Sequence, residues 1–164
     1  MKQLPYFLLA TAIVISLGAC AAPNGGGGSS AAETQLGPHS AQKFVLLTHT
    51  GARELNTADL SYVATMALVL KVEQRMVGGQ QEITATASTH RDGPTGTVLG
   101  VPNLRVHVTQ PVDFSTEPRK AGEAHISKSI PAPGGKFKTV TAEASFDSPD
   151  FNNAVVSLTI PGDQ

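Results

Sequence analysis

The clearest alternation of apolar and polar residues in this chain lies at residues 104–110. Three apolar side chains alternate there with three polar ones, Leu104, Val106 and Val108 with Arg105, His107 and Thr109. Successive side chains of a β-strand point to opposite faces of the sheet, so a period of two predicts a strand with one face in the core and the other in water. Pro111 follows the run and ends it, because proline has no N–H to donate to a neighbouring strand.

Further stretches share this strand-like composition and are bounded by glycine and proline. They are residues 43–49, 62–76, 81–89, 97–99, 123–130, 136–146 and 154–160. The segments between them, such as the turn cluster at 90–96 and the loop at 112–122, are rich in turn-forming residues. About seven or eight short strands at this spacing predict an all-β fold, an antiparallel β-sandwich of immunoglobulin-like architecture. The Cys…Trp…Cys pattern of immunoglobulin domains is missing, so the likeness is one of architecture alone.

Residues 62–76 fit two kinds of secondary structure. Apolar residues recur there at alternate positions, which is typical of a strand. A β-sandwich with one helix at about 57–77 is the alternative, because Thr57-Ala58-Asp59 resembles a helix cap and Gly78 a helix stop. The dipeptide Gly78-Gly79, followed by a second strand-like run, favours a β-hairpin. We therefore expect a strand over 62–76.

The first twenty residues have the pattern of a secretory signal peptide. Lys2 precedes an apolar run at 6–17, and small residues lead to Cys20. The motif Leu17-Gly18-Ala19-Cys20 resembles the lipobox of bacterial lipoproteins. That resemblance implies a signal peptide over 1–19 and acyl chains such as palmitate on Cys20, through which the protein is attached to a membrane. Cleavage after Ala21 by an ordinary signal peptidase is the alternative, since Ala19-Cys20-Ala21 also fits the A-x-A pattern.

The chain after Cys20 changes character at about residue 43. Residues 20–42 include four consecutive glycines followed directly by two serines, a composition typical of a flexible tether. We therefore expect a lipidated cysteine and tether over 20–42 and one β domain over 43–164. Ala21 stands where an aspartate favours inner-membrane retention in enteric-type lipoproteins. The resemblance thus implies anchoring in the outer membrane, on its periplasmic face or at the cell surface.

Charge and cysteine content narrow the chemistry of the domain. The formal net charge is −1 and no cluster of Lys and Arg occurs, which argues against a nucleic-acid partner. Cys20 is the only cysteine, so no internal disulfide can form, and acylation would remove its thiol from catalysis and metal binding. The sequence contains neither a G-x-S-x-G nucleophile elbow nor an H-E-x-x-H zinc motif. We therefore expect no catalytic residues and no cofactor.

Five histidines are scattered along the chain, namely His39, His49, His90, His107 and His125. His49, His107 and His125 lie in or beside expected strands, and a zinc or copper site would need the fold to bring them together. Our first hypothesis is an outer-membrane lipoprotein, not an enzyme, that presents its β-sandwich for interaction with another envelope protein or for envelope assembly. The alternative is a periplasmic ligand- or metal-binding module that uses these three histidines.

The lipobox assignment is testable at Cys20. Metabolic labelling with a clickable fatty acid is expected to mark the wild-type protein. The Cys20→Ser variant is expected to remain unlabelled, as a soluble or uncleaved form, because the serine hydroxyl does not form the thioether. Equal labelling of the two proteins would contradict the assignment.

Overall fold

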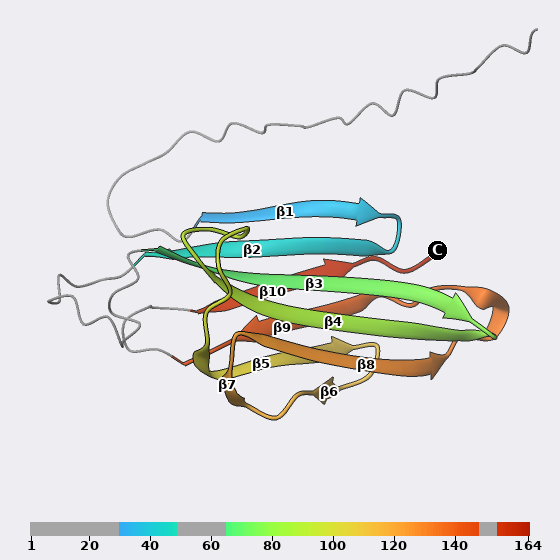
Figure 1. Cartoon of the computed structure of the whole chain (residues 1–164). Helices are drawn as coiled ribbons and strands as arrows, with labels where there is room; N and C mark the ends of the chain where they lie inside the picture. The colour runs from blue at the N-terminus through green and yellow to red at the C-terminus, as the bar shows by residue number, and fades with distance from the viewer. Residues whose placement is uncertain (1–29, 49–64, 148–153) are drawn as a thin grey trace, which may run out of the picture.

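Two antiparallel sheets make up the part of the chain that the computed structural model describes, residues 30–48, 65–147 and 154–164 (Figure 1). The first sheet has the strand order β1-β2-β3-β4-β8, and the second has the order β10-β9-β5-β6 with β7 paired to β5. The bounds are β1 (Ser30–Gly37), β2 (Ser40–Thr48), β3 (Thr65–Val77), β4 (Gln80–Arg91), β5 (Val101–Gln110), β6 (Phe114–Ser115), β7 (Arg119–Ala121), β8 (Glu123–Pro131), β9 (Val140–Ser145) and β10 (Val155–Ile160). A three-residue 3-10 segment, η2 (Pro133–Gly135), follows β8, and no α-helix occurs among the described residues. The expected all-β antiparallel sandwich is confirmed.

The strand expected at 62–76 is confirmed as β3 where the structure describes it, from Thr65 onward. Gly78 and Gly79 join β3 to β4 in a two-residue turn with φ of +56° and +77°. Positive φ at both central residues is what a type I′ hairpin turn requires, and glycine adopts it without steric cost. The alternative of a helix at about 57–77 is therefore wrong over 65–77, and residues 57–64 lie outside the described residues.

The core lies between the two sheets and is built mainly from aliphatic side chains. On β5, Leu104, Val106 and Val108 are fully buried, whereas Arg105 and Thr109 on the opposite face are exposed, as the alternation predicts. The inner faces of β3, β9 and β10 supply much of the remainder: Met66, Leu68, Leu70, Val72, Val140, Ala142, Ala144, Val156, Leu158 and Ile160. The hydrophobic alternation therefore identifies the inward face of β5 correctly.

The expectation of a flexible tether over residues 20–42 is wrong from residue 30 onward. Ser30–Gly37 form β1, which pairs antiparallel with β2. The side chains of residues 31–36 are exposed on both faces of this strand, so no alternating pattern reveals it in the sequence. Main-chain hydrogen bonding to β2, rather than burial of side chains, forms the strand. Residues 1–29, which include the expected signal peptide and Cys20, lie outside the described residues.

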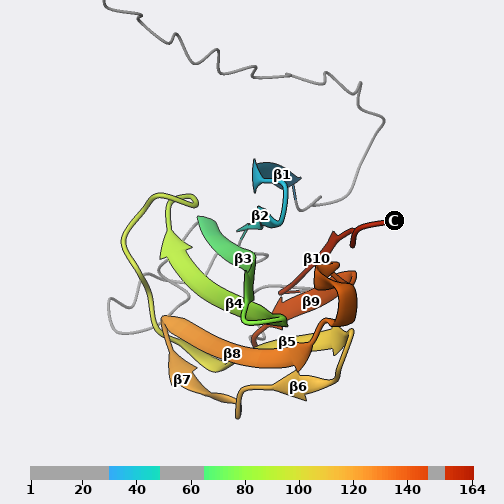
Figure 2. The same cartoon turned by 90° about the vertical axis from the view of Figure 1, so that its right-hand side faces the viewer.

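The loop expected at 112–122 contains two short strands, β6 and β7, which both pair with β5. Gly122 follows β7, at the point where the chain leaves the second sheet and enters the first as β8. A Cβ at Gly122 would lie 2.5 Å from Val98 Cγ1 and 3.3 Å from backbone atoms of Leu99, so glycine allows these two segments to approach closely. This crossing links the two sheets along one side of the sandwich (Figure 2).

The assignment of faces on β5 predicts opposite effects for neighbouring substitutions. Val106→Asp places an unpaired carboxylate at a position with 0 % exposure, and such burial costs several kcal/mol, about the magnitude of a domain's whole stability. We expect this variant to be largely unfolded by circular dichroism. His107→Gln, on the half-exposed opposite face, is expected to change the stability by less than about 0.5 kcal/mol. The reverse result would show that the faces of β5 are inverted.

Candidate functional site

Two of the three candidate metal-binding histidines lie on opposite outer faces of the sandwich. His107 on β5 points away from the core of the second sheet, and its Nε2 lies 3.0 Å from Asp113 Oδ1. His125 on β8 lies on the outer face of the first sheet, with Nδ1 3.3 Å from Thr86 Oγ1. The fold therefore does not bring His107 and His125 together, as the metal-binding alternative would require. His49 lies outside the described residues. No group of three or more His, Cys, Asp or Glu side chains in residues 30–48, 65–147 and 154–164 fits a metal ion.

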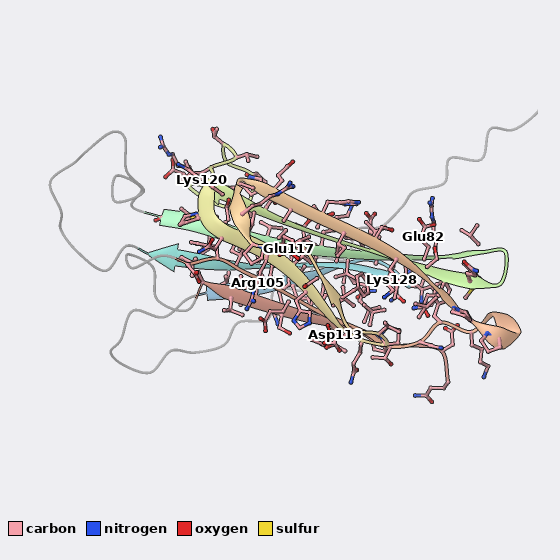
Figure 3. All side chains as sticks on the ribbon, turned by 90° about the horizontal axis from the view of Figure 1, so that it is seen from below. Glu82, Arg105, Asp113, Glu117, Lys120 and Lys128 are labelled. Atoms are coloured by element: carbon pink, nitrogen blue, oxygen red, sulfur yellow. The ribbon has the colours of Figure 1, made fainter. Side chains whose placement is uncertain are left out.

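Acidic and basic side chains are interspersed on the side of the sandwich formed by β5 to β8. Figure 3 shows them along this side: Lys120, Glu117, Arg105, Lys128 and Asp113. Lys128 Nζ lies 5.2 Å from the centre of the Phe114 ring, at the distance of a cation–π contact. The labelled side chains therefore form no patch of a single sign.

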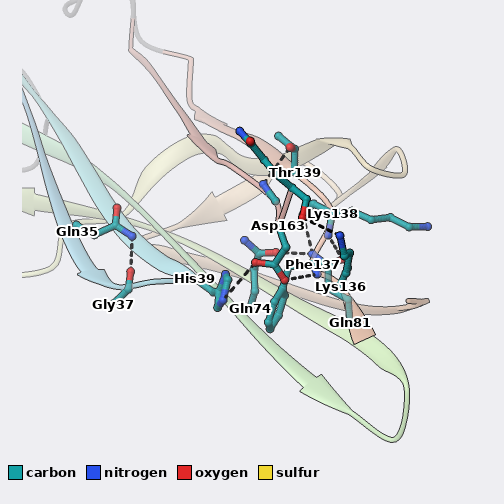
Figure 4. Close-up of polar contacts among 12 residues, drawn as sticks. Gln35, Gly37, His39, Gln74, Gln81, Lys136, Phe137, Lys138, Thr139 and Asp163 are labelled. Atoms are coloured by element: carbon teal, nitrogen blue, oxygen red, sulfur yellow. Dashed lines mark hydrogen bonds and ion pairs between the residues drawn. The ribbon is translucent and has the colours of Figure 1, made fainter. Parts of the chain in front are cut away.

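One end of the sandwich is closed by a cluster that joins residues distant in the sequence (Figure 4). His39, in the turn between β1 and β2, stacks on the ring of Phe137 at a centroid distance of 3.8 Å. His39 Nε2 lies 3.9 Å from Asp163 Oδ1. The backbone N–H of Phe137 donates to Asp163 Oδ2 and the backbone N–H of Asp163 donates to the carbonyl of Phe137, both over 2.9 Å. The first hairpin is thereby held against the segment that follows β10.

Gln81 is a buried polar residue next to this cluster. It has 0 % exposure, and its Oε1 accepts a hydrogen bond of 2.8 Å from the backbone N–H of Lys138. Its Nε2 donates to the carbonyl of Lys138 over 3.0 Å and also to Gln74 Oε1. The side-chain amide thus both donates to and accepts from the Lys138 backbone, as the backbone groups of a neighbouring strand would. Sequence analysis missed this role because Gln81 stands at the polar start of an expected strand.

A polar pocket of about 330 Å³ lies beside the β3–β4 hairpin, lined by Ser40, Glu73, Gln74, Arg75, Glu82 and Thr84. Arg75 Nε donates to Glu82 Oε2 over 2.7 Å. This hydrogen bond lowers the pKa of the Glu82 carboxyl below its ordinary value and raises the pKa of Arg75. Glu73 is paired in the same way with Lys71 Nζ, at 2.9 Å. The charges around the pocket therefore already satisfy one another, which makes it a poor site for a charged ligand.

The most accessible candidate for an interaction is β1. Every side chain from Ala31 to Leu36 is exposed, because β1 extends past the second sheet, whose terminal strand β10 packs against β2 and β3 (Figure 2). β1 is the terminal strand of the first sheet, and its outer edge has no partner strand within the described part of the chain.

The edge of β1 lacks most of the features that protect edge strands. Such strands are commonly very short or contain lysine or proline. β6 and β7 have only two and three residues, and β8 ends at Pro131. β1 has eight residues and contains neither lysine nor proline. Its one charged residue, Glu33, is paired with Lys43 of β2, with Oε2 and Nζ 3.7 Å apart. Within the described ranges, β1 therefore has neither a short length nor a lysine or proline that would oppose pairing at its outer edge.

Sequence analysis also passed over a serine–histidine pair on β4. His90 was expected to begin a turn, whereas it lies within β4, and its Nε2 is 2.7 Å from Ser88 Oγ. The two-residue spacing of Ser88 and His90 could have indicated the pair, because residues i and i+2 of a strand lie on the same face. The pair is on the outer face of the first sheet, because its neighbours Ala87 and Thr89 are buried.

No family model matches the chain, and no curated protein or solved structure is significantly similar to it. Among the described residues, no helix has the length and apolar character needed to cross a membrane. Inference about function therefore rests on the geometry above and on the N-terminal sequence.

The role of Gln81 can be tested by truncating its side chain. Gln81→Ala leaves the N–H and C=O of Lys138 without their partner in a partly buried site, and an unsatisfied buried group costs about 1–3 kcal/mol. We expect urea denaturation to show that the free energy of unfolding falls by about 1–3 kcal/mol or more. Gln80→Ala is the matched control, because Gln80 is exposed, and its stability is expected to stay close to that of the wild type. Equal effects of the two substitutions would rule out a specific role for the buried amide.

Proposed function

We propose that this protein is an outer-membrane lipoprotein whose β-sandwich binds another envelope protein by strand addition at β1. The observation that supports this most directly is an eight-residue strand with six consecutive exposed side chains, whose outer edge pairs with no other strand of the described residues. In strand addition, an extended segment of the partner supplies main-chain hydrogen bonds to such an edge, and alternate side chains supply specificity.

The attachment to the membrane is supported by the likeness of Leu17-Gly18-Ala19-Cys20 to the lipobox. Each buried methylene of an acyl chain contributes about 0.8 kcal/mol, and stable anchoring takes roughly two such chains. A diacylated or triacylated Cys20 meets this requirement without any contribution from the surface of the domain.

The proposed anchor and the proposed binding strand are close in the sequence. Residues 21–29 are the only ones between Cys20 and β1. A fully extended chain advances about 3.5 Å per residue, so Ser30 lies within roughly 35 Å of Cys20 whatever path the chain takes. The partner segment is therefore expected to be close to the membrane surface.

The side chains of β1 indicate which side chains a partner strand would carry. On the outer face of the sheet, Ala32 and Thr34 are small, and on the inner face Ala31, Glu33 and Gln35 include a carboxylate. A partner strand with apolar or threonine side chains on one face and polar or basic side chains on the other is the best match, because directly opposed side chains of these kinds stabilise strand pairs.

Photocrosslinking in intact cells tests this surface. A photoreactive amino acid in place of Thr34, in the full-length acylated chain, is expected to give a discrete crosslinked product. The matched control is the same replacement of Ser127, which lies on the outer face of the same sheet but on the opposite terminal strand, β8. Equal products from both positions, or none from Thr34, would contradict binding at β1.

A further inference from the structure

Ser88 and His90 form a hydrogen-bonded pair with a fixed third member. His90 Nε2 lies 2.7 Å from Ser88 Oγ, and His90 Nδ1 lies 3.0 Å from the carbonyl oxygen of Gly96. A carbonyl oxygen only accepts hydrogen bonds, so Nδ1 carries the proton in the neutral ring and donates it to Gly96. Nε2 is then the acceptor, and the Ser88 hydroxyl donates to it. This is the direction of hydrogen bonding in which a histidine can take the proton of a serine nucleophile.

The position of the Gly96 carbonyl is determined by the turn that follows β4. The backbone N–H of Arg91 donates to the carbonyl of Thr97 over 2.8 Å, and the N–H of Gly96 donates to the carbonyl of Gly93 over 3.1 Å. A Cβ at Gly96 would lie 1.6 Å from the carbonyl oxygen of Arg91, so only glycine fits this position. The turn therefore holds the histidine ring in one orientation, as the third group does in a nucleophile–base–orienting group arrangement.

The side chains next to the pair on the outer face of the first sheet are apolar. Val69 of β3 lies directly across from Ser88, and Ala67 lies across from His90. Although both are on the outer face of the sheet, Val69 is only 5 % exposed and Ala67 is 0 % exposed. On the far side of β3, the half-buried Phe44 and Leu46 of β2 are paired with them in register and extend the same strip. Val69 and Ala67 are themselves covered, so the apolar side chains within reach of an acyl chain on this face are the half-buried Phe44 and Leu46. An acyl chain that extends from Ser88 across β3 to these two side chains would gain hydrophobic contact.

We propose that Ser88 is a nucleophile, activated by His90 as general base, that accepts the acyl group of an ester with an apolar acid portion. Ser88 Oγ forms a bond to the carbonyl carbon while its proton passes to His90 Nε2. The C–O bond to the leaving alcohol then breaks, and the alcohol oxygen takes that proton from Nε2. A water molecule attacks the acyl-serine in the same way, with His90 again receiving and returning the proton, so that ester and water become acid and alcohol.

This activity is separate from the binding proposed at β1. Ser88 lies on β4, with β2 and β3 between it and β1, so photocrosslinking at Thr34 and reactivity at Ser88 report on different surfaces. A failure of either experiment leaves the other informative.

An alkyl fluorophosphonate probe applied to the purified full-length protein tests the proposal. Peptide mass spectrometry is expected to locate the label at Ser88 in the wild-type chain. General-base assistance contributes a factor of about 10²–10⁴, so labelling of His90→Gln should be slower by at least about a hundredfold. The label should persist in Ser127→Ala, since Ser127 lies on the same outer face but is hydrogen-bonded to Thr84 Oγ1, at 3.2 Å.

Wild-type mapping decides the proposal even if a variant folds poorly, and thermal melts of His90→Gln and Ser127→Ala show whether both are folded. A label absent from Ser88, or an unchanged labelling rate in a folded His90→Gln protein, would overturn it. Hydrolysis of p-nitrophenyl octanoate is expected to be faster than that of the acetate, because the longer chain can reach Phe44 and Leu46, and it should be lost in Ser88→Ala. Equal rates for the two esters would overturn the assigned substrate class.

Discussion

β3 lies at the centre of the first sheet, paired with β2 on one side and with β4 on the other. Its inward side chains Met66, Leu68, Leu70 and Val72 have 0 % exposure and face the second sheet. Each such side chain contributes about 1.5–3 kcal/mol on burial, so this face is a large part of what holds the sheets together. The other candidate features depend on it, because the β1–β2 hairpin is attached through β2 and the serine–histidine pair through β4.

The two sides of the sandwich end differently, and this difference explains why the side chains of β1 are exposed. On one side the chain crosses from β7 to β8 at Gly122 and links the sheets. On the other side the second sheet ends at β10, opposite β2 and β3, and β1 extends beyond it. A strand in that position is held by main-chain hydrogen bonds to one neighbour, and its side chains remain in water. The proposed binding surface is thus a consequence of one sheet being wider than the other.

Side chains of β4 alternate between the inner and outer faces of the sheet, and its polar residues have different roles on the two faces. Gln81 points inward, where a polar side chain must find partners, and the Lys138 backbone supplies them. Ser88 and His90 point outward, where they are hydrogen-bonded to each other and to Gly96 and remain partly accessible. The same period of two that buries Ile83, at 0 % exposure, therefore leaves a nucleophile and a base together on the outer surface.

The sequence by itself determined the fold class, the inward face of β5 and the Gly78-Gly79 hairpin, because alternation and turn chemistry act between residues close in the chain. It also indicated the proposed acyl anchor, whose motif is contiguous. Only the tertiary structure decided that residues 30–37 form a strand, since β1 is held by pairing with β2 and has no buried face to produce a pattern. The separation of His107 from His125 and the contact of Gln81 with Lys138 were likewise invisible in the sequence. Both depend on which sheet each strand joins, and that is set by long-range packing between strands.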